Sequence, residues 1–342
     1  MISNVKLYVL SFFSALFLSV LLVPLFRKLS MALGHYDSPN EIKTHKGRVP
    51  LSGGIAIFAA FSVTLVVFRL FTSFPTGTLR DLRYILLGAM VMLALGFIDD
   101  LKKPSGLSVG VKFFFQFAAA AFMVSMGFKI KFIYPEYLAF GLSVFWIVGV
   151  SNALNIIDVM DGLSSSQIFV ACMAFLFIAL PSESIYVNFL AASMAGASLG
   201  FIPYNLSSRL KVFLGDSGSL SCGFVLAVLS LGAEYSKFNP LGVYAPLFIL
   251  AIPIYDTFFV SFMRVRKGIS PFQGTKDHYA LRLERIGFSR RSIVFLSFAA
   301  AVILAFSAFL STRLPLQWGL LVYFIVGGEF LVLSLIISKI KL

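Results

Sequence analysis

Runs of apolar residues, each long enough to cross a bilayer, recur along this chain of 342 residues. About 20 apolar residues in a helix span the hydrocarbon core of a membrane. A helix also satisfies its backbone hydrogen bonds internally, which lipid requires. The sequence therefore predicts an all-α, polytopic integral membrane bundle with about 11 transmembrane helices. We place the spans near residues 7–26, 52–72, 82–98, 112–128, 137–152, 166–181, 187–204, 217–233, 242–262, 292–311 and 317–338.

The composition supports this class over a soluble domain. Hydrophobic residues make up 59% of the chain and charged residues only 13%, whereas soluble domains are about a quarter charged. The first apolar run lacks a small-residue cleavage site, so we expect a retained span and not a signal peptide. Cys172 and Cys222 lie inside apolar runs and are expected to pack without forming a disulfide. We expect residues 1–342 to form a single membrane domain.

Lysine and arginine are distributed unevenly between the two sets of loops. Twenty of the 28 basic residues fall on one side, which the positive-inside rule places in the cytoplasm. The N-terminus is then outside and the C-terminus cytoplasmic. The net charge of +13 suits anionic head groups and a polyanionic substrate, and nucleic acid is not expected because there is no soluble basic domain. The 8 basic residues on the other side are Lys6, Arg69, Arg80, Arg83, Lys129, Lys131, Lys237 and Arg313.

Polar side chains follow one apolar run at regular spacing. Asn152, Asn155, Asp158 and Asp161 stand three residues apart, so a helix would project them along one broad face. Amides and carboxylates beside a buried helix are costly unless they are satisfied. A polar cap at the membrane surface is the simple interpretation. Four such residues on one face favour binding of a hard cation, and Mg²⁺ takes oxygen ligands.

A pair of adjacent carboxylates, Asp99 and Asp100, ends another span. Two neighbouring carboxylates repel each other, so one could have a raised pKa or both could face cations. They could bind metal, accept a proton, or pair with Lys102 and Lys103. Lys112 begins the next span, where it could extend to the interface or hold a phosphate.

Two further segments on the same side carry charged residues. Asp216 starts a span, where it could cap a helix or bind metal. In the longest loop, His278, Arg282 and Arg285 are spaced so that a helix would align them on one face. Arginine pairs bidentately with phosphate, and histidine can add a proton or a hydrogen bond. Carboxylates and cations that converge on one membrane face suit metal-assisted phosphoryl transfer.

Four motifs in order resemble one known family. They are Gly96-Phe-Ile-Asp-Asp100, Asn152-Ala-Leu-Asn-Ile-Ile-Asp-Val-Met-Asp-Gly-Leu163, Phe213-Leu-Gly-Asp-Ser-Gly-Ser219 and His278 with Arg282-Leu283. Together they are similar to the polyprenyl-phosphate N-acetylhexosamine-1-phosphate transferases of glycosyltransferase family 4, in particular the undecaprenyl-phosphate N-acetylglucosaminyl-1-phosphate transferase type. The resemblance covers residues 34–285.

The resemblance implies a reaction and a place in the cell. A polyprenyl phosphate attacks the β-phosphate of a UDP-N-acetylhexosamine, a lipid-linked diphosphosugar forms, and UMP leaves. The implied cofactor is Mg²⁺, with Mn²⁺ as the alternative ion. The implied location is the bacterial inner membrane, with the active site on the cytoplasmic face. The product would begin a cell-envelope glycan, and a homodimer is left open.

The resemblance also implies residue roles. Phe213 and Asp161 stand where the family stacks and hydrogen-bonds uracil, and His278 and Arg282 match the basic motif near the diphosphate. The implied catalytic residues are Asp99, Asp100, Asp158 and His278, the implied substrate-binding residues are Lys112, Asp161, Phe213, Arg282 and Arg285, and the implied metal ligands are Asn155 and Asp216.

Three alternatives fit the sequence less well. The resemblance implies a basic motif richer in histidine, but Tyr279, Ala280 and Leu281 stand where more polar residues are common. The consecutive histidines of a phospho-N-acetylmuramoyl-pentapeptide transferase are absent. An intramembrane aspartyl protease would use Tyr255-Asp256 with a Gly-x-Gly-Asp motif, but Phe213 occupies the first glycine position. A cation-coupled transporter would use a broken helix such as the one with Pro246 and Pro253. However, its acids would lie near the midplane, and there is no internal repeat.

Overall fold

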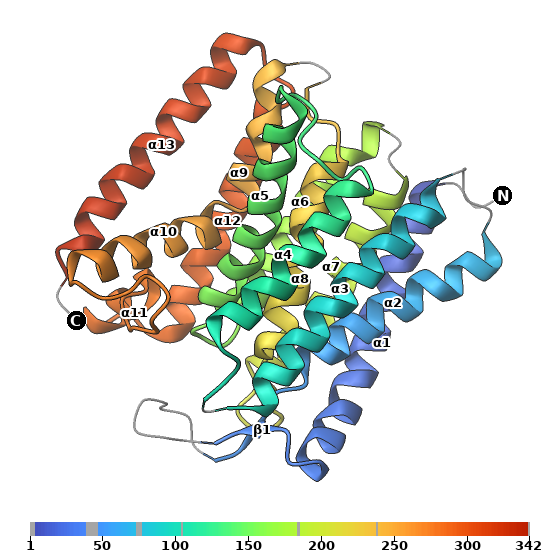
Figure 1. Ribbon diagram of the computed structural model, residues 1–342, viewed down its shortest axis with the longest axis vertical. Coiled ribbons are helices and arrows are strands. Elements are labelled where there is room, and N and C mark those ends of the chain that lie inside the picture. The colour runs from blue at the N-terminus through green and yellow to red at the C-terminus, as the bar shows by residue number, and fades with distance from the viewer. Residues whose placement is uncertain are drawn as a thin grey trace.

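The computed structural model describes residues 4–38, 47–72, 77–103, 105–182, 185–236 and 239–340. Most of these residues are helical and form one bundle, which confirms the predicted fold class (Figure 1). The longer helices are α1 (Asn4–Ala32), α2 (Gly53–Phe71), α3 (Thr78–Leu101), α4 (Val109–Ser125), α5 (Glu136–Ile156), α6 (Leu163–Ala179), α7 (Ile185–Asn205), α8 (Gly215–Gly232), α10 (Ala251–Arg266), α12 (Arg290–Ser311) and α13 (Leu316–Ser338). The short elements are β1 (Tyr36–Asp37), β2 (Val49–Pro50), η1 (Leu180–Ser182), η2 (Pro240–Tyr244), α9 (Ala245–Ile249) and α11 (Tyr279–Arg285).

Each predicted span coincides with one helix or with one bent pair of helices. Among the described residues, 8 helices are long and apolar enough to cross a membrane. The segment from η2 to α10 is bent by 68° at a short break and would be a ninth span. The helices α4 and α6 are apolar but have only 17 residues each. The structure therefore supports a multi-pass protein, and the count of about 11 stays a prediction.

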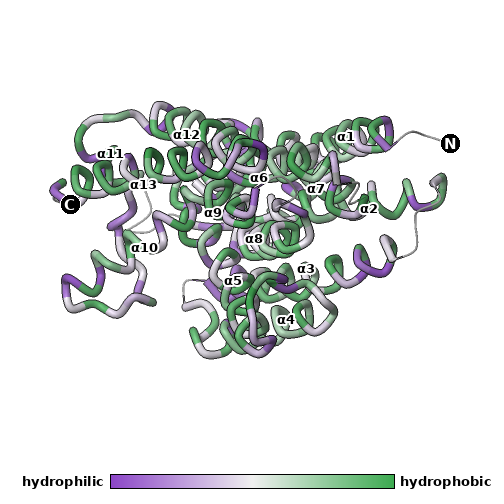
Figure 2. The backbone as a smooth tube through the Cα atoms, turned by 90° about the horizontal axis from the view of Figure 1, so that it is seen from above, coloured by the Kyte–Doolittle hydropathy of each residue, from purple (hydrophilic) through white to green (hydrophobic). Residues whose placement is uncertain are grey.

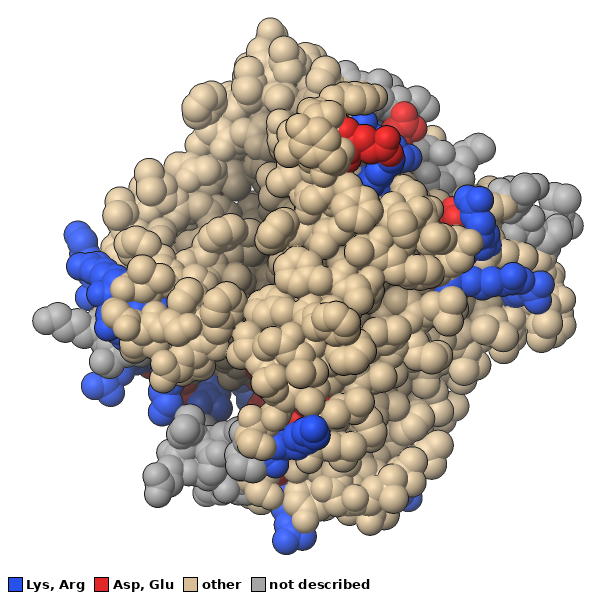
Figure 3. Space-filling model, viewed as in Figure 1, with Lys and Arg blue, Asp and Glu red and all other residues tan. Residues whose placement is uncertain are grey.

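The core of the bundle is built around α7 and α8, most of whose residues are buried. Small residues let the neighbouring helices approach closely, as is usual where helices pack in lipid. A Cβ added to Gly196 on α7 would lie 2.0 Å from the backbone oxygen of Phe12 on α1. The outer helices are apolar on their exposed faces, and Figure 2 shows green over much of the bundle. Figure 3 shows a wide band without charged residues between two charged edges.

The beginning of α8 is held at the end of the bundle where β1 lies (Figure 1). A Cβ on Gly54 of α2 would meet the Gly218 Cα at 2.1 Å, and one on Gly96 of α3 would meet the Asp216 backbone oxygen at 2.3 Å. The backbone N–H groups of Gly53 and Gly54 also donate to the carbonyl oxygens of Phe213 and Leu214. Close packing and backbone hydrogen bonds therefore fix the first turn of α8 against α2 and α3.

The first predicted cytoplasmic loop contains the two strands. β1 pairs with β2 in an antiparallel register, Tyr36 with Pro50 and Asp37 with Val49. Phe213 continues this pairing, since its backbone N–H donates to the Pro50 carbonyl oxygen. Residues 39–46, which include Lys43 and Lys46, lie outside the described residues.

The C-terminal part of the bundle is more open. The helix α13 stands at its edge (Figure 1), and its only buried residues are Gly319 and Ile337. Such an exposed apolar surface suits contact with lipid. The short helix α11 lies below α10, toward the same end of the bundle as β1 (Figure 1). The segments that carry the predicted site residues thus gather at one end, as the loop assignment predicts.

Candidate active site

Asp99, at the end of α3, is bound from two sides. Its Oδ2 lies 2.8 Å from the Lys112 Nζ on α4, and its Oδ1 accepts a hydrogen bond from the Leu107 backbone N–H at 2.5 Å. The turn that brings Leu107 back to Asp99 uses Gly106 at a φ of +67°, a conformation that glycine adopts without strain. The structure thus pairs Asp99 with the lysine that the sequence assigned to phosphate binding.

Asp100 points the other way, into the protein. Its Oδ1 and Oδ2 accept hydrogen bonds from the backbone N–H groups of Asp216 and Ser217, both at 3.1 Å. These N–H groups belong to the first turn of α8, where a negative charge is favoured. Gly215, at a φ of +75°, leaves room for the carboxylate, because a Cβ there would lie 2.7 Å from the Asp100 Oδ2. Asp100 therefore fastens α3 to the start of α8.

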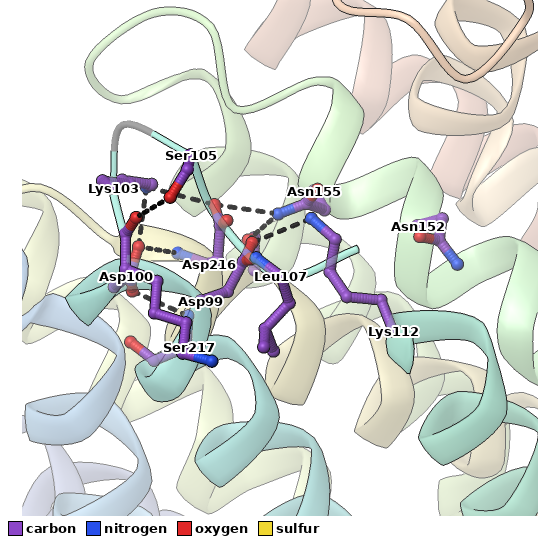
Figure 4. A network of polar contacts seen from close by, with 12 residues as sticks. Asp99, Asp100, Lys103, Ser105, Leu107, Lys112, Asn152, Asn155, Asp216 and Ser217 are labelled. Carbon is purple, nitrogen blue, oxygen red and sulfur yellow. Dashed lines mark hydrogen bonds and ion pairs between the residues drawn. The ribbon is translucent and has the colours of Figure 1, made fainter. Parts of the chain in front are cut away.

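Asp216 lies at the centre of the polar network in Figure 4. Its Oδ1 accepts from the Asn155 Nδ2 at 3.2 Å and lies 3.5 Å from the Lys103 Nζ. Asn155 also donates to the Ser219 hydroxyl at 2.9 Å. The two residues assigned as metal ligands are therefore neighbours.

Lys103 neutralises part of this carboxylate cluster. Its Nζ lies 2.6 Å from the Asp100 Oδ1 in addition to its contact with Asp216. Burial alone would lower the pKa of the Lys103 ammonium, but the carboxylates of Asp216 and Asp100 raise it above its ordinary value. Lys103 therefore stays charged.

The four polar residues after position 151 do not lie on one helix face, so that expectation was wrong. The helix α5 ends at Ile156, so only Asn152 and Asn155 belong to it. Asn152 points away from the cluster and pairs with Gln116 on α4, to which it donates at 2.7 Å (Figure 4). Asp158 and Asp161 belong to the turn before α6, which Gly162 closes at a φ of +83°.

Asp158 lies next to the cluster and forms no ion pair within the described part of the chain. Burial raises the pKa of the Asp158 carboxyl to about 8, and the negative charge of Asp216 adds to this rise. The Lys103 ammonium acts in the opposite direction. The environment therefore favours the protonated form of Asp158 at neutral pH.

Asp161 and Phe213 share a basic neighbour. The Lys211 Nζ lies 2.6 Å from the Asp161 Oδ2 and 5.7 Å from the centre of the Phe213 ring. An aromatic ring beside a carboxylate is a suitable pair for a planar base that donates a hydrogen bond. The structure thus brings the two residues assigned to uracil next to each other through Lys211.

The basic motif occupies a different part of the same end. His278 precedes α11 and pairs with Asp256. Arg282 is buried, and its Nη2 lies 2.8 Å from the Asp277 Oδ1, while its Nη1 donates to backbone carbonyls at the end of α13. Arg285 is exposed. The three residues thus differ in surroundings and do not form one exposed face.

A contact between aromatic rings connects this motif to the carboxylate cluster. The Phe272 ring, in the loop before His278, lies 5.5 Å from the Phe113 ring in an edge-on arrangement. Phe113 directly follows Lys112, the partner of Asp99. The loop that leads to His278 therefore reaches the start of α4, next to the cluster.

The donor set fits a magnesium ion that is completed by substrate. In the described part of the chain, no group of three or more His, Cys, Asp or Glu side chains could hold a metal alone. Mg²⁺ is usually bound through one or two carboxylates, waters and substrate phosphates. Asp216 supplies a carboxylate, and Asn155 can present its oxygen if its amide is turned by half a rotation. These two residues, with a phosphate ligand, would make such a site.

Sequence reasoning missed several members of the site. Lys103 was seen only as a partner for the aspartates, and Lys211 and Asp277 carried no assignment. Asp256 appeared only in a protease motif that failed. Two signals were available in the sequence. Lys103 stands three residues after Asp100, and Asp256 is a carboxylate inside an apolar helix.

Comparison with known proteins agrees with this geometry. A family model described as glycosyl transferase family 4 matches residues 82–234. The probable undecaprenyl-phosphate N-acetylglucosaminyl 1-phosphate transferase of Bacillus subtilis is 29% identical over 93% of this chain and 88% of its own length. The undecaprenyl-phosphate alpha-N-acetylglucosaminyl 1-phosphate transferase of Salmonella typhi is 30% identical over 88% of this chain and 83% of its own. The chain therefore belongs to glycosyl transferase family 4.

Proposed function

We propose that this protein transfers N-acetylglucosamine 1-phosphate from UDP-N-acetylglucosamine to undecaprenyl phosphate and releases UMP. The observation that carries the proposal is the Asn155–Asp216 contact, which stands beside carboxylates bound by Lys103 and Lys112. The names of the relatives supply the sugar and the lipid. The reaction forms a bond from a lipid phosphate oxygen to the β-phosphorus and breaks the bond between the β-phosphorus and the oxygen shared with the α-phosphate.

The protein would act mainly by positioning charged groups. Lys112 and Asp99 lie where α3 and α4 meet, and Lys112 would hold the lipid phosphate by charge. Asp161 and Phe213 would bind the uracil, with Lys211 leaving Asp161 when the base arrives. A divalent ion held by Asn155 and Asp216 would neutralise charge on the diphosphate. A phosphate monoester is largely ionised near pH 7, so a strong base is not needed.

The remaining assigned residues would complete the site. Asp100 would hold the first turn of α8, and Asp158 would supply a carboxyl beside the metal ligands. His278, with Arg282 and Arg285 from α11, would form the basic side of the diphosphate site. We place this site at the cytoplasmic face of a bacterial inner membrane, because the positive-inside rule assigns the loops that carry most of the basic residues to that face. The whole chain would act as one domain, and cross-linking would test whether it forms a homodimer, which the sequence leaves open.

A direct assay tests the proposed function. Purified protein in phospholipid nanodiscs is incubated with UDP-N-acetylglucosamine, undecaprenyl phosphate and Mg²⁺, and UMP is measured. UMP should form only when all three are present, and EDTA should stop the reaction. UDP-N-acetylgalactosamine and UDP-N-acetylmuramoyl-pentapeptide serve as competing substrates. If UDP-N-acetylglucosamine yields no UMP, the proposal is wrong.

A further inference from the structure

Asp256 is a buried carboxylate that the site described above does not use. It lies on α10, inside the apolar part of the bundle, and none of its surface is exposed. A carboxylate at such a position is costly unless it is paired and hydrogen-bonded. Its presence therefore calls for a specific partner.

Both oxygens of this carboxylate bind to the start of α11. Oδ2 lies 2.7 Å from the His278 Nδ1, and Oδ1 accepts a hydrogen bond from the Tyr279 backbone N–H at 3.0 Å. Tyr279 is the first residue of α11. One side chain thus sets both the ring of His278 and the backbone next to it.

This contact determines which ring nitrogen of His278 is available. A carboxylate oxygen accepts hydrogen bonds, so the bound Nδ1 carries a proton. Within the described residues, Nε2 has no hydrogen-bond partner and is not completely buried. Nε2 is therefore the ring atom left for a ligand.

The other charged groups nearby have partners of their own. Asp277 binds Arg282 and Lys267, and Arg264 donates to the Pro271 carbonyl oxygen and the Thr275 hydroxyl. Burial would raise the pKa of Asp277, but Lys267 and Arg282 hold it below its usual value. Within the described residues, Asp256 is thus the one carboxylate bound to His278.

We infer that Asp256 is the positioning residue for His278 in the transfer reaction. It fixes the imidazole with its proton on Nδ1 and leaves Nε2 to meet the diphosphate of the UDP-sugar. The inference rests on the proposed function for the identity of that ligand. The pairing itself stands on the two contacts of Asp256.

Asp256→Asn tests the inference with little change in shape. The Asn carbonyl oxygen can keep the hydrogen bond from the Tyr279 N–H, while its NH₂ group donates to Nδ1 and forces the ring proton to Nε2. Loss of a carboxylate that orients a histidine typically costs about 10–100-fold in activity. We expect UMP formation to fall by about this factor in kcat, with the KM for UDP-N-acetylglucosamine changed less than about threefold.

Nuclear magnetic resonance provides a readout that does not depend on activity. The chain has only three histidines, so ¹⁵N-histidine labelling in nanodiscs gives a simple spectrum, and His278→Gln assigns the signal of His278. The wild-type spectrum should show a proton on Nδ1, and Asp256→Asn should move it to Nε2. Because the wild-type measurement does not depend on Asp256→Asn, it also decides the case if that variant fails to fold.

Ser297→Ala is the matched control. The Ser297 hydroxyl contacts the Tyr279 hydroxyl at 2.8 Å, so this variant loosens α11 without touching His278. It should keep turnover within about twofold and a wild-type histidine spectrum, as expected for a small polar change away from the reacting groups. An unprotonated Nδ1 in the wild type, or an Asp256→Asn turnover within threefold of wild type, would overturn the inference. Absence of UMP from the wild type would instead refute the proposed function, with the spectrum still deciding the Asp256–His278 pairing.

Discussion

The Asn155 amide nitrogen lies 3.2 Å from a carboxylate oxygen of Asp216, although the two residues are 61 positions apart in the sequence. The contact joins the end of α5 to the first turn of α8. That turn is itself held by Asp100 and by the backbone of α2. The arrangement makes several predictions that can be tested separately.

Gly54→Ala should disrupt the close packing of α2 against the first turn of α8. The added Cβ would lie 2.1 Å from the Gly218 Cα, and a helix backbone cannot move aside as a side chain can. Overpacking of this kind costs about 1–3 kcal/mol, or more when backbone is involved. Thermal unfolding in detergent should show a clear loss of stability. Gly141→Ala on α5 is the control, since a Cβ there meets nothing within 4 Å, and an equal loss in both variants would refute the packing argument.

Asp100→Asn should weaken metal use more than lipid use. An Asn side chain can accept only one of the two N–H groups at the start of α8, and it loses the charge that faces Lys103. The Mg²⁺ concentration for half-maximal activity should rise by about 10-fold or more, as for other residues that orient a metal ligand. Hydrogen exchange at Asp216 and Ser217 should become faster. A higher KM for undecaprenyl phosphate with unchanged Mg²⁺ dependence would instead assign Asp100 to the lipid.

Arg282→Ala should reduce both stability and activity. It removes the buried partner of Asp277 and the donor to carbonyls at the end of α13. Breaking a buried ion pair by removing one partner costs about 3–5 kcal/mol, and the remaining Lys267 contact places the expected loss near the lower value. Arg285→Ala, on the exposed surface, should change stability by less than about 0.5 kcal/mol. Equal unfolding temperatures for the two variants would show that the Arg282 contacts do not stabilise the fold.

Asp158 should make stability depend on pH in a defined direction. Its folded-state pKa of about 8 lies above the ordinary value of 3.8, so the folded protein binds this proton more tightly. The resulting stabilisation is complete below about pH 4 and declines until about pH 8. In the metal-free protein, the unfolding temperature of the wild type should fall relative to Asp158→Asn between pH 5.5 and pH 8. If the unfolding temperatures of the two proteins change with pH in parallel, the pKa of Asp158 is not raised.

The sequence was sufficient to predict the helices and the end of the bundle where charge collects. Apolar runs report helices directly, because lipid leaves the backbone few alternatives. The motif residues at 99, 155 and 216 were also identified in advance, and the structure brings them together. The sequence did not reveal that α5 stops at Ile156, because a turn closed by Gly162 looks locally like a continuing polar face.

Long-range partners were harder to predict than the motifs. Nothing near Asp256 in the sequence points to His278, which lies 22 positions away. The contact depends on the break between α9 and α10 and on how the following loop folds back. The buried position of Arg282 likewise depends on α13, because its guanidinium donates to the backbone carbonyls of Ile337 and Ser338, which lie 55 and 56 positions further along the chain.

Binding of Mn²⁺ to the metal-free protein tests the central claim most directly. Electron paramagnetic resonance can count bound Mn²⁺ in nanodiscs with UDP present as the phosphate ligand. We expect one Mn²⁺ for each wild-type chain, with binding weakened at least tenfold in Asn155→Ala and Asp216→Asn. Binding should be preserved in Ser221→Ala, whose hydroxyl donates to the carbonyl oxygens of Ser217 and Gly218 on its own helix. Mn²⁺ binding by Asp216→Asn and Asn155→Ala as tight as that of the wild type would contradict the account.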